Sequence, residues 1–410
     1  MKAVNKENML KIPYGRQNIN DSDINAVIKV LYSEFLTQGP VIPLFESTIA
    51  GYCGASFSCA VNSATSALHI SCLALGVGPG DIVWTSPNTF VASANCALYC
   101  GADVDFVDID PLSYNMCIQK LEEKLREAKK NNKLPKIVIP VHYAGQTCDM
   151  KRIHDLSKIY NFKIIEDASH AIGGKYKSAC FPEDSESDSS CFKAVGGCQY
   201  SDITVFSFHP VKIITTGEGG VAVTNSEILI ERLRRLRSHG ITSDQNLMDQ
   251  RPLDEIWNYQ QIELGFNYRM TEIQAALGVS QMSRIDSFVK ERHRIAEEYN
   301  KELEGLPIFL PWQDSFSYSS YHLYPIRLNL KIISKSQRQI YDELIQNDVI
   351  VNLHYIPVYR QPYYERMGFK RGYCPEAEKF HEEVLSLPIF PDLGVENQDR
   401  VIRLMRELIA

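Results

Sequence analysis

The sequence predicts an α/β fold, with a mostly parallel sheet flanked by helices and a smaller α+β domain at the C-terminal end. Short apolar runs typical of strands alternate with helical patterns between residues 81 and 225, and this alternation predicts a parallel sheet covered on both faces. From about residue 305 onward, a few strand-like runs precede a final helix. We therefore expect a large domain with an N-terminal arm over residues 1–285 and a small domain over 286–410.

Composition is that of a soluble globular protein, with 44% apolar residues, 23% charged residues and a mean hydropathy of -0.20. The net charge of -7 gives no general attraction for nucleic acid or for an anionic membrane. No apolar run reaches the roughly 18 residues of a membrane span, and the first 15 residues lack the apolar core of a secretory signal. Eleven cysteines without a CxxC pair indicate reduced thiols and a cytoplasmic protein.

Two helices are expected before the first long strand run. In residues 20–36 the apolar side chains Ile24, Val27, Ile28 and Leu31 recur at helical spacing, and Asp21 or Ser22 is the expected cap. Residues 61–81 predict a turn, a helix and a Gly-Pro-Gly break.

The remaining elements follow in chain order. Strand-like runs are "DIVWTS" (81–86), "DVDFVDID" (103–110), "KIVIPVHY" (136–143), "FKIIEDA" (162–168), "ITVFSF" (203–208) and "GVAVTN" (220–225), and "MKRIHDLSKIY" (150–160) predicts a helix between two of them. A long amphipathic stretch over 271–305 is expected to bridge to the small domain, which contains the runs 321–328 and 348–359. Residues 178–198 form an acidic, serine-rich segment typical of a surface loop.

Lys212 lies in an unusually apolar run. From Ile203 through Gly217 only His209 and Lys212 can titrate. The ordinary explanation is a lysine whose stem covers apolar surface while its ammonium group stays in water. The alternative is a desolvated lysine, part of which is a neutral amine and therefore a nucleophile toward carbonyls.

Three polar residues follow neighbouring strand runs. Asp167 ends "KIIED", His142 ends "IVIPVH", and Lys212 lies just beyond "ITVFSF". Singly, His142 is best explained as a satisfied core residue, and Asp167 equally well as a helix cap. Together they favour a site, because ligands of open α/β sheets bind at the carboxyl ends of the strands.

The segment "NSATSAL" (62–68) is a loop of small residues that enters a helix. Free N–H groups and the positive end of the helix dipole suit a phosphate there, although a plain N-cap is the competing explanation. The spacing of Cys180, Cys191 and Cys198 does not support a metal site.

A phosphate cradle, a carboxylate and a desolvated lysine are the parts that hold pyridoxal 5'-phosphate (PLP). The lysine binds the cofactor covalently, and the carboxylate keeps the ring nitrogen protonated. An aromatic side chain must also cover the ring, and Phe90 in "SPNTFVASAN" is the candidate. Core packing is the alternative role for Phe90.

Several segments also resemble a known family. They are "NSATSALH", "PNTFVASANCALYCGA", "PVHYAGQTCDM", "IIEDASHAIGG", "SDITVFSFHPVKIITTGEGG", "LRSHGI", "ELGFNYRMTEIQAALG" and "LHYIPVYRQPYY". In this order, across nearly the full chain, they resemble the PLP-dependent sugar-nucleotide aminotransferases of the type I, aspartate-aminotransferase fold. Within the family, "PVHYAGQTCDM" and "FSFHPVKIITTGEGG" are most similar to the pseudaminic acid branch, which implies transfer from L-glutamate to C4 of a UDP-4-keto-6-deoxy-N-acetyl-hexosamine with an L-altrosamine product.

The resemblance implies a role for individual residues. Lys212 and Asp167 are then the catalytic pair. The residues that hold the cofactor are Ala64, Thr65, Phe90, Asp167, His170, Ser207, Lys212 and Asn267. Those that line the sugar-nucleotide pocket are Tyr14, Glu34, Phe35, Leu36, Thr37, Ala64, Ser207, Asn267, His354, Tyr355 and Ile356. Members are homodimers with shared active sites, so Asn267 is expected to reach the site of the neighbouring subunit.

Other functions stay open from the sequence. One is an aminotransferase for another UDP- or dTDP-keto-sugar, acting at C3 or C4. Another is a PLP-binding regulatory or structural homologue without turnover, against which intact Lys212, Asp167 and His170 argue. A related branch performs deoxygenation with histidine at the lysine position, and Lys212 argues against it. The insertion over 178–198, where most relatives have a short turn, is expected at the pocket rim.

Overall fold

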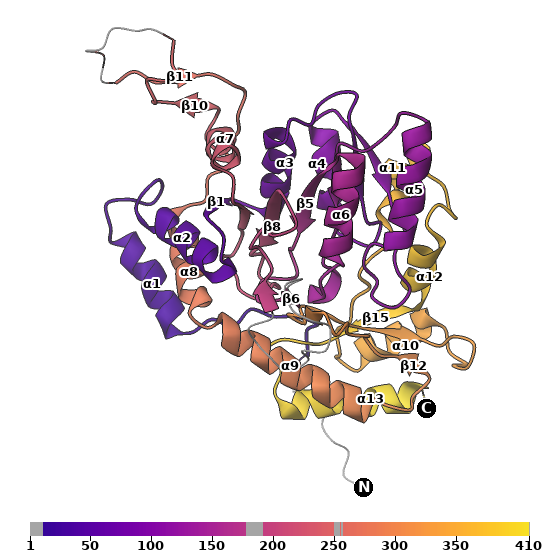
Figure 1. Cartoon of the computed structure of the whole chain (residues 1–410). Coiled ribbons are helices and arrows are strands. Elements are labelled where there is room, and N and C mark those ends of the chain that lie inside the picture. Colours follow the sequence, from indigo (N-terminus) through magenta and orange to yellow (C-terminus); the bar gives the residue numbers. More distant parts are fainter. Residues whose placement is uncertain (1–10, 178–191, 250–254, 256, 410) are drawn as a thin grey trace.

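The structure, a computed structural model, describes residues 11–177, 192–249, 255 and 257–409. A seven-stranded sheet lies at its centre (Figure 1), in the order β1-β9-β8-β5-β4-β2-β3. The strands are β1 (Phe57–Val61), β2 (Ile82–Thr85), β3 (Asp103–Phe106), β4 (Ile137–Ile139), β5 (Lys163–Asp167), β8 (Ile203–Ser207) and β9 (Gly220–Thr224). Strand β9 is antiparallel to both β1 and β8, whereas β8, β5, β4, β2 and β3 pair in parallel. The predicted mostly parallel sheet is confirmed.

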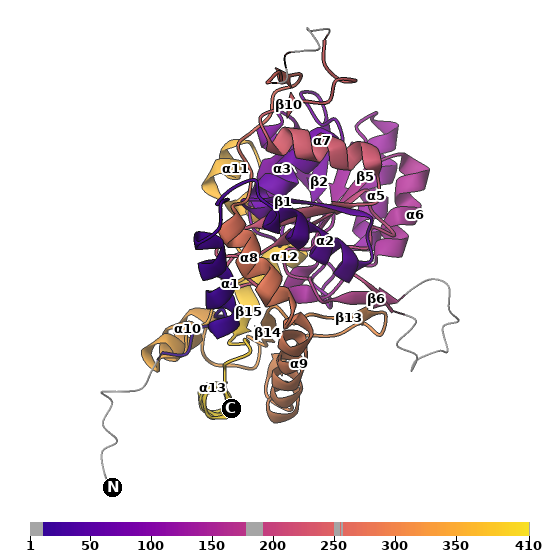
Figure 2. The same ribbon diagram turned by 90° about the vertical axis from the view of Figure 1, so that its left-hand side faces the viewer.

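Helices cover both faces of this sheet (Figure 2). These helices are α2 (Val41–Cys53), α3 (Ala64–Ala74), α4 (Ala92–Tyr99), α5 (Ile118–Lys130), α6 (Met150–Tyr160), α7 (Glu227–Arg237) and α8 (Glu272–Met282), and α1 (Asp21–Leu31) lies outside them on α8. Apolar residues of α3, α4 and α7 form one core with one face, and those of α2, α5, α6 and α8 form a second core with the other. Successive strand residues alternate between the two cores, so Ile165 belongs to the first and Ile164 to the second. The sheet is therefore buried on both sides, which explains its nearly continuous apolar runs.

Helix boundaries follow from local chemistry. Helix α6 has the predicted bounds, because the side chain of Asp149 accepts the N–H of Arg152 at its start and Asn161 takes a left-handed conformation at its end. The cap of α1 is Asn20, which forms a capping box with Asp23, and the expected caps Asp21 and Ser22 are wrong.

The apolar face of α1 is not buried within this chain. Ile24, Ile28 and Leu31 are 49%, 41% and 55% exposed, whereas Asp23 and Val30 are buried. Asp23 accepts hydrogen bonds from Ser280 at 2.6 Å and Gln281 at 2.8 Å, which attaches α1 to α8 through a polar seam. A row of apolar side chains therefore remains at the surface.

The amphipathic stretch over 271–305 forms two helices, with α8 ending at Met282 and α9 running over Ile285–Glu302. The C-terminal elements are β12 (Ile308–Phe309), β14 (Tyr324–Leu328), α10 (Gln337–Gln346), η4 (Val358–Arg360), α11 (Pro362–Arg366), α12 (Pro375–Glu383), β15 (Val384–Leu387) and α13 (Val395–Ile409). The antiparallel sheet β12-β14-β15, with α9, α10 and α13, surrounds a third core. This arrangement is the predicted α+β unit.

Residues beyond 286 also contribute to the large core. Val358, Tyr359 and Phe380 pack with the side chains that cover the first face of the central sheet. The boundary between residues 285 and 286 stays a prediction. Two small sheets complete the description, β10 (Ile241–Thr242) with β11 (Gln260–Gln261) and β13 (Ser317–Tyr318) with β6 (Lys175–Lys177) and β7 (Phe192–Ala194), and Figure 1 shows β10 and β11 projecting beyond the body.

The described cysteines are all free thiols, and all but the half-buried Cys198 are buried. Cys180, Cys191 and most of the acidic loop lie outside the described residues. Within the described ranges no helix is long and apolar enough to cross a membrane. The same ranges contain no group of three or more His, Cys, Asp or Glu side chains placed to hold a metal ion.

Candidate active site

A cavity of about 1010 Å³ opens beyond the carboxyl ends of the central parallel strands. Val141, Asp167 and Ser207 line it where three neighbouring strands end, at the edge where α/β sheets bind ligands. The predicted site residues that line it are Tyr14, Ala64, Thr65, Phe90, Asp167, His170, Ser207, Lys212, His354, Tyr355 and Ile356. Segments from both ends of the chain therefore meet at one place.

Lys212 follows β8 and is half-buried in the cavity wall. Its backbone N–H donates to the carbonyl of His209 at 2.9 Å, in a tight turn just beyond the strand. Desolvation lowers the pKa of Lys212 to about 8, although the negative charge of Asp167 acts in the opposite direction. About one amine in ten is then neutral at pH 7, against about one in 3,000 at the ordinary pKa of 10.5. The lowered pKa favours the desolvated lysine over the solvated one.

Asp167 ends β5 and is 4% exposed. Its Oδ1 accepts the N–H of Ser169 at 3.1 Å, and its Oδ2 accepts the hydroxyl of Ser93 at 2.6 Å. The carboxylate is therefore held from two sides at the cavity wall. It faces the same cavity as the lysine amine.

The start of α3 forms one wall of the cavity. Ser63 is the N-cap and accepts the N–H of Ser66 at 3.1 Å, and Ala64 and Thr65 are the first helical residues. The first N–H groups of a helix have no intrahelical acceptor, so this wall offers donors and the positive end of a dipole. Gly220 of β9 backs it so closely that a β-carbon there would lie 2.5 Å from the carbonyl carbon of Ser63 and would also meet the nitrogen of Ala64.

His170 is neutral and has a defined tautomer. Its Nδ1 accepts the backbone N–H of Ala144 at 3.3 Å, so the proton is on Nε2, which donates to the hydroxyl of Tyr355 at 3.1 Å. Burial, followed by the charge of Lys212, lowers the pKa of His170 well below its ordinary value. The ring cannot add a second positive charge beside the lysine.

His354 lines the cavity together with Tyr14 and Asn352. The amide of Asn352 lies 3.2 Å from Nε2 of His354 and can only donate to it, so Nδ1 donates to the hydroxyl of Ser386 at 2.9 Å. The ring of Tyr14 packs on that of His354 with centroids 5.3 Å apart. Burial lowers the pKa of His354 to about 3.

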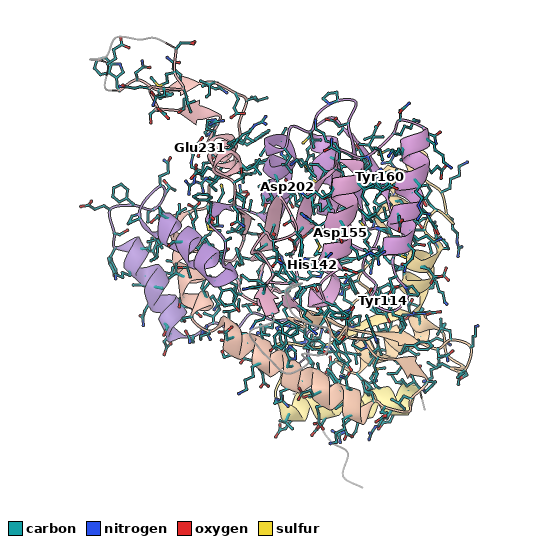
Figure 3. The ribbon with its side chains drawn as sticks, in the orientation of Figure 1. Tyr114, His142, Asp155, Tyr160, Asp202 and Glu231 are labelled. Atoms are coloured by element: carbon teal, nitrogen blue, oxygen red, sulfur yellow. The ribbon has the colours of Figure 1, made fainter. Side chains whose placement is uncertain are left out.

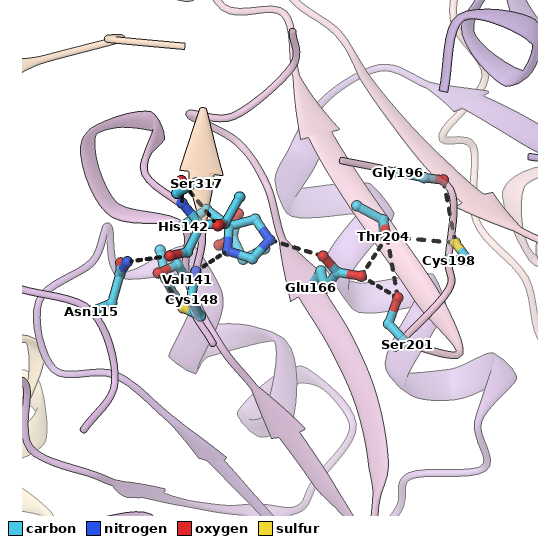
Figure 4. Close-up of polar contacts among 12 residues, drawn as sticks. Asn115, Val141, His142, Cys148, Glu166, Gly196, Cys198, Ser201, Thr204 and Ser317 are labelled. Carbon is cyan, nitrogen blue, oxygen red and sulfur yellow. Dashed lines mark hydrogen bonds and ion pairs between the residues drawn. The ribbon is translucent and has the colours of Figure 1, made fainter. Parts of the chain in front are cut away.

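His142 does not belong to this site, and the expectation that it converges with Asp167 and Lys212 is wrong. Its Nδ1 accepts the N–H of Cys148 at 3.1 Å, and its Nε2 donates to Glu166 at 2.8 Å (Figure 4). Val141 lines the cavity, and the next residue along an extended chain points to the opposite face.

Glu166 is turned away from the cavity for the same reason. Figure 3 shows His142 among the side chains that fill the interior, and the Glu166 carboxylate that it meets is fully buried. Ser201 and Thr204 complete the cluster by donating their hydroxyls to that carboxylate (Figure 4). This buried pair joins the parallel strands behind the site.

Some predicted site residues do not line the cavity of this chain. The segment 34–37 lies at the surface, where the carbonyl of Leu36 accepts the N–H of Glu272 at 3.0 Å and Thr37 forms a bridge with Thr271. Asn267 forms a bridge with Ser238. Asn267 was assigned to the site of a second subunit, so the single chain does not test it, and the roles of Glu34, Phe35, Leu36 and Thr37 stay predictions.

Other residues line the cavity without having been predicted. They are Thr89, Val91, Ala92, Ser93, Val141, Ser169, His209, Val211, Glu218, Gln274, His322, Asn352, Leu353 and Gln361. Asn62, Ser63, Ser66 and Leu68 also line the cavity and belong to the predicted phosphate segment 62–68. Many of them neighbour a predicted residue in sequence, as Ser93 neighbours Phe90. His322 and Gln274 come from distant segments and carry no local signal.

The aminotransferase model for DegT/DnrJ/EryC1/StrS proteins matches residues 17–406. The chain is 36% identical over 387 residues to the UDP-4-amino-4,6-dideoxy-N-acetyl-beta-L-altrosamine transaminase of Campylobacter jejuni, covering 94% of each chain. It superposes with a TM-score of 0.84 on Helicobacter pylori PseC, an aminotransferase involved in the biosynthesis of pseudoaminic acid, at 28% identity over 97% of this chain and 99% of that one. The PLP-form of the sugar aminotransferase Spr1654 from Streptococcus pneumoniae gives a TM-score of 0.82 at 27% identity, covering 98% and 100% of the two chains.

These likenesses confirm the predicted family, fold, enzyme class and cofactor. The donor set fits that cofactor as well, since a desolvated amine, a buried carboxylate and the start of a helix line one cavity. The chain belongs to the DegT/DnrJ/EryC1/StrS aminotransferase family and is a PLP-dependent sugar aminotransferase.

Proposed function

We propose that the enzyme transfers an amino group from L-glutamate to C4 of a UDP-4-keto-6-deoxy-N-acetyl-hexosamine and forms an L-altrosamine product of pseudaminic acid biosynthesis. The observation that carries this proposal is the 36% identity, over 94% of both chains, to a transaminase named for that product. A second Campylobacter jejuni enzyme of the same name is also 36% identical.

The cavity supports a substrate larger than an amino acid. Its volume of about 1010 Å³ is at the upper end for small-molecule sites. Tyr14, Asn352 and His354 also line it, and they offer hydroxyl, amide and imidazole groups suited to a sugar nucleotide. We assign this side of the cavity to the sugar.

In this assignment Lys212 would bind the cofactor covalently, and Asp167 would contact its ring nitrogen. The start of α3 and Ser207 would bind its phosphate, and Phe90 would cover the face of its ring. Phe90 lines the cavity with 61% of its surface exposed, an unusual state for phenylalanine that a stacked ring would relieve. PLP supplies an aldehyde carbonyl and a ring that accepts electrons. Lys212, once free as a neutral amine, is the base that moves a proton at the substrate carbon, and neighbouring His170 stays neutral.

The pH dependence of cofactor capture follows from the lysine. Because its pKa is lowered to about 8, the neutral fraction rises about tenfold per pH unit below 8 and levels off above it. The rate at which cofactor-free protein binds PLP covalently is expected to follow this curve from pH 6 to 10 in stopped-flow absorbance. A rate that still rises tenfold per unit between pH 9 and 10 would show an ordinary, solvated lysine.

The Gly220→Ala variant tests the phosphate wall. The added methyl group would collide with the backbone of Ser63 and Ala64, so the first turn of α3 must move. We expect affinity for PLP to fall at least about tenfold, with a loss of about 1–3 kcal/mol in stability. Equilibrium titration and thermal unfolding measure the two effects. Gly51→Ala is the matched control, since Gly51 lies within α2 and a β-carbon there meets nothing within 4 Å; equal losses in both variants would contradict the proposal.

A homodimer in the cytoplasm is part of the proposal. The exposed apolar face of α1, with Ile24, Ile28 and Leu31, supports a second copy as the covering surface. The same assembly would bring Asn267 and the segment 34–37 to a neighbouring site.

Product analysis tests the function. Purified protein is incubated with glutamate and a panel of UDP- and dTDP-keto-sugars, and NMR locates the new amine and its configuration. We expect amination of the UDP-4-keto-6-deoxy-N-acetyl-hexosamine at C4. A 31% identical relative, the UDP-4-amino-4-deoxy-L-arabinose--oxoglutarate aminotransferase of Shewanella sediminis, makes another UDP-sugar the chief alternative. Turnover of other keto-sugars alone would refute the pathway assignment and leave the enzyme class intact.

A further inference from the structure

The carboxylate of Asp167 has a hydroxyl partner that comes from α4. The Oγ of Ser93 donates to Oδ2 of Asp167 at 2.6 Å, and the Oγ1 of Thr89 lies 2.7 Å from the same Oγ. Ser93 is fully buried, and Thr89 and Asp167 are 3% and 4% exposed. Bulk water therefore does not compete for these bonds.

The direction of this hydrogen-bond chain is determined. A carboxylate can only accept, so Ser93 gives its one hydroxyl proton to Asp167. Ser93 then has only lone pairs left for Thr89, so Thr89 donates to Ser93. Bonds in such a chain polarise one another, and a hydroxyl donated to a carboxylate is among the stronger neutral-to-charged bonds.

We propose that Ser93 is a positioning residue that, supported by Thr89, fixes the carboxylate of Asp167 for its contact with the ring nitrogen of PLP. This inference rests on the assignment of Asp167 to that nitrogen. Ser93 holds one oxygen while the N–H of Ser169 holds the other, so the carboxylate plane cannot rotate.

A purely local role for Ser93 is the competing explanation. Its Oγ also lies 3.4 Å from the carbonyl of Phe90, a contact with the residue just before the N-cap of α4. That contact is longer by 0.8 Å than the one to Asp167 and has a neutral acceptor. The charged acceptor at the shorter distance takes the proton.

The experiment uses full-length protein loaded with PLP carrying ¹⁵N at the ring nitrogen. The ¹⁵N chemical shift reports whether this nitrogen is protonated, and it is followed against pH in the absence of substrates. In Ser93→Ala we expect the ring nitrogen to lose its proton about one pH unit lower than in the wild type, which is about a tenfold lower affinity for that proton. Affinity for PLP is expected to fall about tenfold. Thr89→Val is expected to give a smaller change of the same sign.

Ser71→Ala is the matched control, because Ser71 is equally buried, lies in the neighbouring helix α3, and its hydroxyl has no partner among the described residues. It is expected to leave the ¹⁵N titration unchanged. A Ser93→Ala curve that coincides with the wild type overturns the proposal. Asp167→Asn in the same titration distinguishes a failure of this proposal from a failure of the proposed function. If Asp167→Asn shifts the curve and Ser93→Ala does not, only the role of Ser93 is overturned. If neither variant shifts the curve, the role of Asp167 is overturned too.

Discussion

The Lys212→Ala variant is expected to lose amino transfer by a factor of at least about 10⁴. A positioned general base alone contributes about 10² to 10⁴ in rate, and the variant also loses the covalent hold on the cofactor. The decisive measurement is a single turnover, in which the loaded protein meets glutamate and 2-oxoglutarate is quantified. Adding methylamine is expected to restore part of the rate, because a small neutral amine can enter the cavity and take up the proton.

A chemical label checks the same assignment independently. Borohydride reduction of the PLP-loaded protein fixes a pyridoxyl group on the lysine that carries it, and peptide mass spectrometry locates the label. We expect it on Lys212. Lys151→Ala is the control, since Lys151 is exposed on α6 and forms an ion pair with Asp155. A label on another lysine, or a Lys212→Ala variant within tenfold of the wild-type rate, would defeat the assignment.

Much of the large domain could be predicted because local sequence signals mark the ends of its helices and strands. Helix α6 begins at a capping aspartate and ends at a left-handed asparagine, and both signals are in the sequence. Strands β5 and β8 are apolar runs buried on both faces. The reversed direction of β9 has no such signal, because period and apolarity are the same for a strand of either direction.

The sequence did not predict which surface covers the apolar face of a helix. Helix α1 has a clear apolar stripe, but Ile24 and Ile28 stay exposed in the single chain. Spacing identifies which residues share a face and says nothing about what covers it. The break between α8 and α9 has no signal in the spacing either, because the amphipathic pattern continues across it.

For the site, the sequence predicted where the strands end, but it did not predict to which face of the sheet the side chains there point. Asp167 and His142 both follow strands, yet a displacement of one residue sends His142 to the far face, where it meets Glu166. Ser93 was missed because its partner lies 74 positions away. Lys212 could be found because its desolvation is visible in the apolar run around it.

The Asp167→Asn variant is expected to lower kcat/KM by about 10² to 4 × 10³, and to lower it alike for glutamate and for the keto-sugar. Asparagine has the same shape but no charge, so it cannot balance a protonated ring nitrogen. Breaking a buried charge pair costs about 3–5 kcal/mol, and about 1.4 kcal/mol corresponds to each factor of ten in rate. Separate half-reactions, followed by the absorbance of the cofactor, measure the two losses.

Equal losses of kcat/KM in both half-reactions are the distinguishing result, because the ring nitrogen is needed in the reaction with the amino acid and in the reaction with the sugar. Tyr14, on the side assigned to the sugar, is the contrast: Tyr14→Phe is expected to impair only the sugar half. Asp155→Asn, at an exposed position of α6, controls for the loss of a carboxylate elsewhere. If Asp167→Asn impaired one half alone, its carboxylate would be a substrate contact rather than the partner of the ring. The hydroxyl of Ser93 and the N–H of Ser169 would then orient it toward that substrate.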